Sequence, residues 1–192
     1  MYVERVIYPV STLGPGKRIA VWVRGCTKKC EHCINPDLWG ERRDKDIPVS
    51  QLLGFIGNII DKNPVDGITL TGGDPLEQDG ETLAFISGIH NKCPDILVYT
   101  GYTLSELDSL WTREKMTALK ENAAVVIDGR YIHHLNDGLS SLRGSTNQQI
   151  HFFDEDLRPQ YERYMRETGR QVQNFYYEDN LISVGIHNNL EG

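Results

Sequence analysis

The amino-acid sequence predicts an α/β fold built on a mainly parallel sheet. Short apolar segments that resemble strands alternate with segments whose apolar residues recur at helical spacing, and turn residues separate the two kinds. This alternation is typical of α/β proteins, because a helix returns the chain to the start of the next parallel strand. The length of 192 residues favours one domain and falls short of the roughly 250 residues of a complete eight-stranded β/α barrel.

Each element follows from its local pattern. The five expected strands are Ile19–Val23, Gly67–Thr71, Ile96–Thr100, Ala123–Ile127 and Gln149–Phe153. The expected helices cover about 52–60 with Ser50 as N-cap, 83–89, a segment that starts at the Thr103/Glu106 capping box, 113–121, and 157–168 closed by Gly169 in a left-handed conformation. A hairpin is expected over 171–186 around Glu178-Asp179-Asn180. We therefore predict a single domain over residues 1–192, with a core over about 6–153 and a C-terminal extension over 154–192.

Composition and charge exclude several classes of protein. Apolar residues make up 39% of the chain, a globular composition once the 18 glycines are added. No apolar run approaches the ~18 residues that cross a bilayer, and the N-terminus lacks the apolar core of a signal peptide, so we expect a cytoplasmic protein with no membrane partner. The net charge of −7 argues against nucleic acid as a partner.

The charge is unevenly distributed along the chain. Residues 1–33 carry six basic and two acidic side chains, including Lys28 and Lys29, whereas the rest of the chain carries 14 basic and 25 acidic side chains. Such a positive segment either steers an anionic ligand or an acidic partner to the protein or is an ordinary solvated loop.

Three cysteines within eight residues indicate a metal site. Cys26, Cys30 and Cys33 follow the first expected strand with the spacing Cys-x3-Cys-x2-Cys, and open α/β sheets place their sites at such strand ends. Three thiolates can bind three irons of an iron–sulfur cube and leave the fourth iron open to an outside ligand. The alternatives are structural zinc, with His32 or Cys93 as fourth ligand, and unliganded thiols. Cys93, distant in sequence, is expected to be a semi-buried thiol.

An ordered set of motifs resembles a known family. The cysteine motif is followed by Thr71-Gly72-Gly73-Asp74-Pro75 after the second strand, as in the radical S-adenosylmethionine superfamily. Further pieces over about residues 6–151 resemble the activating proteins of anaerobic ribonucleoside-triphosphate reductase. They are Tyr8-Pro9, Gly14-Pro15-Gly16, Thr100-Gly101-Tyr102, Asp128-Gly129-Arg130 and Arg143-Gly144-Ser145-Thr146-Asn147-Gln148.

The resemblance implies a fold and a chemistry. The fold is a partial, open β/α barrel of the radical S-adenosylmethionine type, with five to six strands. The cofactors are one [4Fe-4S] cluster, held by Cys26, Cys30 and Cys33, and S-adenosylmethionine on the open iron. The reduced cluster cleaves S-adenosylmethionine, and the product removes hydrogen from a glycine of a large glycyl radical enzyme. Because the cofactor carries the reaction, no catalytic acid or base is expected.

The resemblance also implies roles for individual residues. His32 approaches the adenine, Asn35 orients the cluster loop, and Gly72, Gly73 and Asp74 receive the ammonium of S-adenosylmethionine. Other candidate cofactor contacts are Cys33 and Ile34 beside the cluster and Thr100 and Asp128 at the ends of the third and fourth strands. The electron donor is expected to be flavodoxin or a similar acidic protein that docks on the positive segment around Lys28 and Lys29.

Two departures from the family pattern keep other functions open. Ile34 stands where the family commonly has an aromatic residue, and residues 154–192 extend past the end of short family members. One alternative is a radical enzyme that acts on another protein or a small molecule. A different class of alternative is a non-catalytic zinc or iron–sulfur interaction module, in which Gly72-Gly73-Asp74 is only a turn.

Overall fold

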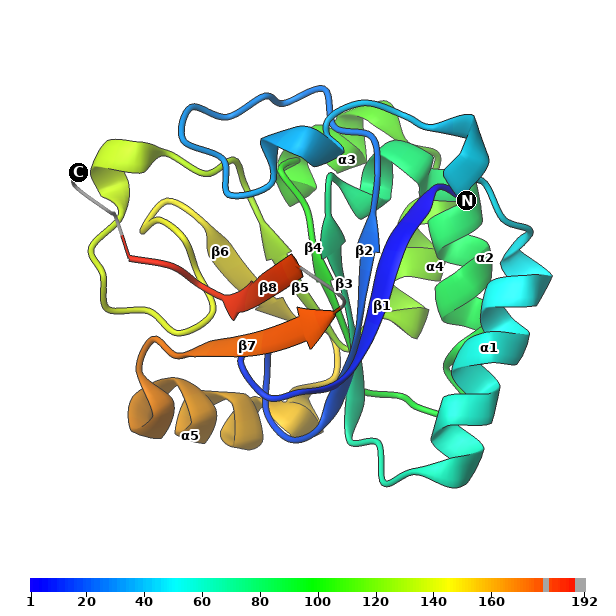
Figure 1. Cartoon of the computed structure of the whole chain (residues 1–192). Helices are drawn as coiled ribbons and strands as arrows, with labels where there is room; N and C mark the ends of the chain where they lie inside the picture. Colours follow the sequence, from blue (N-terminus) through cyan, green and yellow to red (C-terminus); the bar gives the residue numbers. More distant parts are fainter. Residues whose placement is uncertain (178–179, 189–192) are drawn as a thin grey trace.

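A six-stranded sheet forms the centre of the protein (Figure 1). The computed structural model describes residues 1–177 and 180–188, and its strands follow one another across the sheet in chain order. They are β1 (Val3–Val10), β2 (Arg18–Val23), β3 (Gly67–Gly72), β4 (Ile96–Tyr99), β5 (Val125–Asp128) and β6 (Gln149–Phe152). β2 to β5 are parallel, whereas β1 and β6 run antiparallel to their neighbours at the two edges. The predicted α/β fold with an open, mainly parallel sheet is confirmed.

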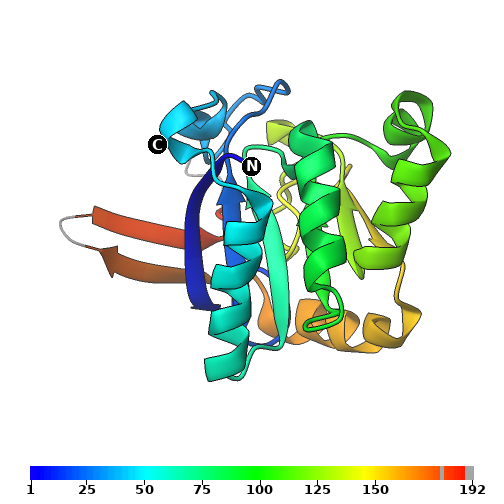
Figure 2. The ribbon, with the colours of Figure 1, turned by 90° about the vertical axis from the view of Figure 1, so that its right-hand side faces the viewer.

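Helices that connect the parallel strands cover one face of the sheet (Figure 2). They are α1 (Val49–Lys62), α2 (Asp79–Ile89), α3 (Leu104–Leu110) and α4 (Arg113–Asn122). All six residues of β2 are buried, as expected for a central parallel strand that is covered on both faces. Among the described helices, none is long and apolar enough to cross a membrane.

The helix ends test the local predictions. The Thr103/Glu106 capping box is confirmed, because the Thr103 hydroxyl accepts from the Glu106 N–H at 3.2 Å and the Glu106 carboxylate accepts from the Thr103 N–H at 2.7 Å. Ser50 as an N-cap is wrong: α1 begins at Val49, and Pro48 is the N-cap. Its carbonyl accepts from two N–H groups of the first turn. Gly169 ends the last helix with a φ of 59° as expected, but its ψ of −168° is not left-handed helical.

β1 was not among the expected strands. Val3, Val6 and Ile7 are the β-branched residues that signal it, but Pro9 weakens the pattern because proline cannot donate to a sheet ladder. The structure resolves this conflict by making β1 an edge strand, where proline is tolerated.

The C-terminal segment packs on the face of the sheet opposite α1, α2 and α4 (Figure 1). It consists of α5 (Arg158–Thr168), β7 (Val172–Tyr177) and β8 (Asn180–Gly185), which confirms the expected C-terminal helix and hairpin. The expected turn residues Glu178 and Asp179 lie outside the described residues.

A buried polar network fastens this segment to the sheet. The Tyr161 hydroxyl donates to Asp95 Oδ1 at 2.6 Å, and Arg18 donates to Asp95 Oδ2 at 2.8 Å. Arg18 and Tyr161 are both fully buried. A buried charge is tolerated only when it is paired, so α5 completes the environment of an ion pair that the core by itself would leave partly exposed.

Candidate functional site

The loop after β2 leaves the sheet and returns to its own base. The Gly25 N–H donates to the Leu38 carbonyl at 2.9 Å, and the Cys26 N–H donates to the Trp39 carbonyl at 3.0 Å. Arg24 braces the same base, because its buried guanidinium donates to the carbonyls of Asp37 at 2.5 Å and Gly40 at 3.0 Å. We refer to residues 25–39 as the cysteine loop. Its base is rigidly tied, and its tip presents Cys30 and Cys33.

The tip of the cysteine loop contains unusual backbone geometry. Lys29 has a φ of 46° and His32 a φ of 56°, so the residue before each of the last two cysteines lies in the left-handed region that non-glycine residues rarely adopt. The Cys33 N–H donates to the Cys30 carbonyl at 3.2 Å. Strained backbone of this kind persists where surrounding contacts impose it and concentrates at functional sites.

Gly72 and Gly73 let the end of β3 lie against the base of the cysteine loop. A Cβ on Gly72 would lie 2.5 Å from the Val23 carbonyl oxygen, and one on Gly73 would lie 2.5 Å from the Gly25 carbonyl oxygen. The Asp74 N–H donates to that same Gly25 carbonyl at 2.8 Å. The two glycines are therefore required by backbone packing, whether or not a ligand is bound.

Asp74 joins the ends of β3 and β4. Its buried carboxylate accepts from the Thr100 hydroxyl at 2.9 Å, the Gly101 N–H at 2.9 Å and the Leu76 N–H at 3.0 Å. Burial raises the pKa of the Asp74 carboxyl to about 6, against the opposing effect of these hydrogen bonds. Both oxygens thus already accept hydrogen bonds within the protein.

Asp128 has a similar role at the end of β5. It is buried and accepts from the Leu104 N–H at 2.8 Å, with the Nε2 of His151 3.0 Å from the same oxygen. Like Asp74, Asp128 organises the backbone around the carboxyl ends of the strands.

Lys28 anchors the cysteine loop from within. Its side chain is only 4% exposed; Nζ lies 3.0 Å from Glu77 Oε1 and 3.0 Å from the centroid of the Tyr102 ring. Glu77 Oε1 also accepts from the N–H and the hydroxyl of Thr27. Glu77 belongs to the turn that follows Gly72-Gly73-Asp74, so this contact ties the chain between Cys26 and Cys30 to the second motif.

The three cysteine thiols are half-buried and unpaired. Burial raises the pKa of Cys26, opposed by backbone hydrogen bonds from Lys28 and Lys29. Burial also raises the pKa of Cys30, opposed by a backbone hydrogen bond from Tyr131. Backbone N–H groups directed at a sulfur stabilise its thiolate form, which is the form that binds metal.

A cavity of about 570 Å³ opens beside Cys33. His32, Cys33 and Ile34 form one of its walls, and Tyr131 and His133 form part of another. The rings of His32 and His133 stack with centroids 4.0 Å apart. The cysteine loop therefore borders an open cavity large enough for a small ligand.

Comparison with known proteins agrees with this geometry. A family described as "4Fe-4S single cluster domain" matches residues 12–151. The anaerobic ribonucleoside-triphosphate reductase-activating protein of Salmonella typhimurium is 33% identical over 150 residues, which are 75% of this chain and 94% of the relative. The protein of the same name from Haemophilus influenzae is 36% identical over 154 residues, 76% of this chain and 95% of the relative. The one from phage T4 is 32% identical over 149 residues, 75% of this chain and 90% of the relative.

The chain belongs to the anaerobic ribonucleoside-triphosphate reductase-activating protein family. The family match covers β2 to β5, most of β6 and the cysteine loop, whereas β1 precedes it. The whole C-terminal segment of α5, β7 and β8 lies beyond that match.

Within this family framework, the predicted site residues separate into two groups. His32, Cys33 and Ile34 line the cavity. The others do not line the described part of that cavity: Cys26, Cys30 and Asn35 of the cysteine loop, and Gly72, Gly73, Asp74, Thr100 and Asp128 at the carboxyl ends of the strands. Their roles toward a cofactor remain predictions.

Sequence reasoning missed several residues of the site. His133 follows the Asp128-Gly129-Arg130 motif by three residues, and nothing in its local sequence reveals that it stacks on His32.

The predicted positive docking surface is weaker than the charge count indicated, because Arg18, Arg24 and Lys28 are all buried in ion pairs. Local charge does not reveal which cations are already neutralised inside the fold.

Proposed function

We propose that this protein is a radical S-adenosylmethionine enzyme that generates a glycyl radical on an anaerobic ribonucleoside-triphosphate reductase. The observation that carries the proposal is the direct attachment of the cysteine loop to Gly72-Gly73-Asp74. The Gly25 carbonyl accepts from the Asp74 N–H, and Glu77 binds the chain between Cys26 and Cys30. This attachment holds the second motif beside the loop that carries the thiols, which is where the family resemblance places S-adenosylmethionine.

The donor set fits a [4Fe-4S] cluster with one open iron. Cys26, Cys30 and Cys33 supply three soft thiolate ligands on one loop. Among the described residues, no three histidine, cysteine or acidic side chains already stand together as ligands of a single metal ion. The fit of the cluster therefore rests on the chemistry and the spacing of the three thiols.

This chain's own residues would bind and orient the cofactors. Cys26, Cys30 and Cys33 would hold the cluster. His32, Ile34 and Asn35 are proposed to contact or orient S-adenosylmethionine from the cysteine loop, and Gly72, Gly73, Asp74, Thr100 and Asp128 from the strand ends. The cluster would supply the electron that cleaves S-adenosylmethionine, which yields methionine and, once a hydrogen atom is taken from the glycine Cα, 5′-deoxyadenosine.

The first experiment measures metal content and cleavage. Anaerobically purified protein should contain about four iron and four sulfide per chain, and with dithionite it should convert S-adenosylmethionine to 5′-deoxyadenosine. Cys30→Ala should abolish this conversion, whereas the matched control Cys93→Ala should retain it, because Cys93 lies in the apolar core. About one zinc per chain without sulfide would contradict the proposal.

The second experiment identifies the partner. Mixing the reduced enzyme and S-adenosylmethionine with the anaerobic reductase of the same genome should produce the doublet of a glycyl radical in electron paramagnetic resonance. Cleavage without that signal would favour a radical enzyme that acts on another protein or a small molecule. We further propose flavodoxin or a similar protein as the electron donor and the cytoplasm as the location.

A further inference from the structure

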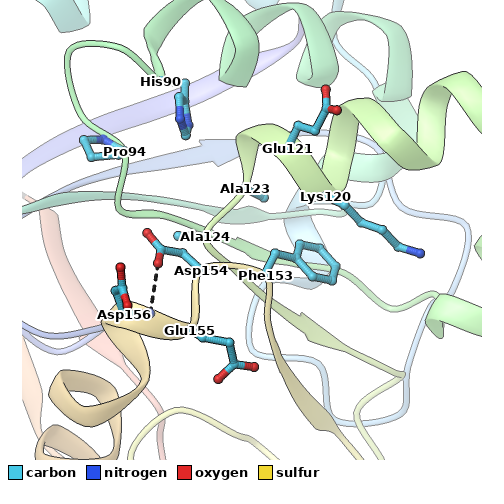
Figure 3. A pocket seen from close by; sticks show the side chains of 10 residues that line it. All are labelled: His90, Pro94, Lys120, Glu121, Ala123, Ala124, Phe153, Asp154, Glu155 and Asp156. Atoms are coloured by element: carbon cyan, nitrogen blue, oxygen red, sulfur yellow. Dashed lines mark hydrogen bonds between the residues drawn. The ribbon is translucent and has the colours of Figure 1, made fainter.

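Two of the cavities lie at opposite ends of the parallel strands. The cavity of about 390 Å³ at the amino ends of β4 and β5 is lined by several carboxylates (Figure 3). Asp154 accepts from the Asp156 N–H at 3.0 Å, and Glu155 pairs with Arg158 at 2.5 Å. These two carboxylates therefore stabilise the start of α5, and the cavity beside Cys33 is the better candidate for a binding site.

The cavity beside Cys33 has a wall that the family match does not cover. Gly185, Ile186, His187 and Asn188 form this wall, and they lie more than thirty residues beyond the end of the match at residue 151. We refer to residues 185–188 as the C-terminal wall. It faces the same space as the cysteine loop, so whatever enters this space must pass beside it.

The C-terminal wall is firmly attached to the sheet. The inner face of the hairpin packs Phe175, Ile182 and Val184 into an apolar cluster with residues of β1 and β2. Val184, the residue before the wall, is 2% exposed, and its carbonyl accepts from the Thr12 hydroxyl at 2.8 Å. The wall is therefore a fixed part of the cavity.

Arg170 holds this wall against the loop of the Arg143-to-Gln148 motif. Its guanidinium donates to the carbonyls of Ser140 at 2.9 Å, Arg143 at 3.0 Å and His187 at 3.0 Å. The Arg170 side chain is 4% exposed. Only arginine offers enough donors in one plane to join three backbone carbonyls from two segments. Arg170 is thus positioned to keep two walls of the cavity in register.

The chemistry of the lining indicates the kind of occupant. Among the described residues that line the cavity, none is Asp, Glu, Lys or Arg. The lining combines apolar side chains such as Ile34 and Ile186 with imidazoles and amides such as those of His187 and Asn188. A peptide backbone needs donors and acceptors for its N–H and C=O groups wherever it is buried, and imidazoles and amides can supply both. The lining suits a peptide segment.

We propose that the C-terminal wall, positioned by Arg170, selects the glycine-bearing peptide segment of the protein substrate as it enters the cavity beside Cys33. This inference rests on the proposed function and adds to it a specificity element beyond the family match. Arg170 is a positioning residue, because it acts through the wall. His187 connects it to the cavity, since the His187 carbonyl accepts from Arg170 and His187 itself lines the cavity.

The test compares two variants with a matched control. Arg170→Met removes the hydrogen bonds from the guanidinium to the three carbonyls. His187→Trp narrows the cavity beside Cys33 and keeps those hydrogen bonds, because they use the backbone carbonyl of residue 187. Arg166→Met removes an arginine of α5 whose side chain is 69% exposed. Each protein is assayed for the Kd of the anaerobic reductase from the same genome, the apparent KM for that reductase, and S-adenosylmethionine cleavage with dithionite in the absence of the reductase. Melting temperatures identify any variant that fails to fold.

We expect Arg170→Met and His187→Trp to raise both the Kd and the apparent KM for the reductase at least tenfold. Cleavage without the reductase should stay within twofold of wild type in Arg170→Met, and Arg166→Met should resemble wild type throughout. If Arg170→Met does not fold, the His187→Trp result decides.

Three outcomes would overturn the inference. Unchanged affinity for the reductase, with normal cleavage and radical formation, would show that the wall does not select the protein substrate while the proposed function stands. A raised KM for S-adenosylmethionine with an unchanged KM for the reductase would assign the cavity to the cofactor. If wild-type protein cleaves no S-adenosylmethionine at all, the proposed function fails and this inference fails with it.

Discussion

Replacing Lys28 by methionine removes a buried cation from the cysteine loop and keeps most of its apolar stem. The change eliminates the 3.0 Å contact with Glu77 and the 3.0 Å contact with the Tyr102 ring. A hydrogen bond to a charged group contributes about 1.5–3 kcal/mol, and a desolvated cation–π contact contributes about 2 kcal/mol. Since both contacts involve one ammonium, they are not additive, and we expect a loss of about 2–4 kcal/mol in the free energy of unfolding.

Lys29 provides the matched control for this prediction. It is the adjacent residue, it has the same charge, and it is exposed. Lys29→Met should therefore change the free energy of unfolding by no more than about 0.5 kcal/mol. Urea unfolding of the metal-free proteins, followed by tryptophan fluorescence, measures both values.

Lys29, which is exposed, also tests the docking of an acidic electron donor. Lys29→Glu should slow reduction by flavodoxin and leave reduction by dithionite unchanged if the exposed part of the loop meets the donor. Losses of similar size for Lys28→Met and Lys29→Met in the unfolding experiment would refute the reasoning about burial. Equal slowing with both reductants would refute the docking role.

Three further predictions concern the core around the site. Tyr161→Phe should lower the free energy of unfolding by about 1–3 kcal/mol, because it removes a donor from the buried Asp95 carboxylate, and urea unfolding measures this loss. Gly73→Ala should cost about 2 kcal/mol or more and reduce iron retention, since its Cβ would lie 2.5 Å from a backbone oxygen of the cysteine loop. Burial raises the pKa of the Asp74 carboxyl from 3.8 to about 6, so the folded state favours its protonated form. The stability that the protonated Asp74 carboxyl contributes is present below pH 4 and is lost as the pH rises through 6. Between pH 4.5 and 7, wild type should therefore lose about 2 kcal/mol relative to Asp74→Asn.

Each of these predictions has its own control. Gly80 lies in α2, and a Cβ at this position would have no atom within 4 Å. Gly80→Ala should therefore leave the free energy of unfolding unchanged or raise it by about 0.5 kcal/mol. If Gly73→Ala behaves like Gly80→Ala, the close approach of β3 to the cysteine loop is wrong. A constant difference between wild type and Asp74→Asn across the pH range would contradict the raised pKa. A Tyr161→Phe protein as stable as wild type would show that the hydrogen bond to Asp95 contributes nothing.

Much of the fold could be predicted because its signals are local. The strand segments that became β2 to β6 are short apolar runs between turn residues, and the capping box at Thr103 and Glu106 involves residues three apart. The start of α1 was misplaced by an N-cap rule that favours Ser50, whereas the structure uses the Pro48 carbonyl. β1 was missed because its partner is β2 and its proline is acceptable only at an edge, and neither condition is visible in the local sequence.

The sequence by itself determined the spacing of Cys26, Cys30 and Cys33, the Gly72-Gly73-Asp74 turn after the next strand, and thereby the family. These features are predictable because ligand spacing and backbone freedom are properties of neighbouring residues. Only the tertiary structure decided that Lys28 is a buried anchor while Lys29 faces solvent, and that Arg170 joins a C-terminal wall to the cavity. The physical reason is that burial and partner choice depend on groups brought together from distant parts of the chain, such as Glu77 for Lys28 and the Ser140 carbonyl for Arg170.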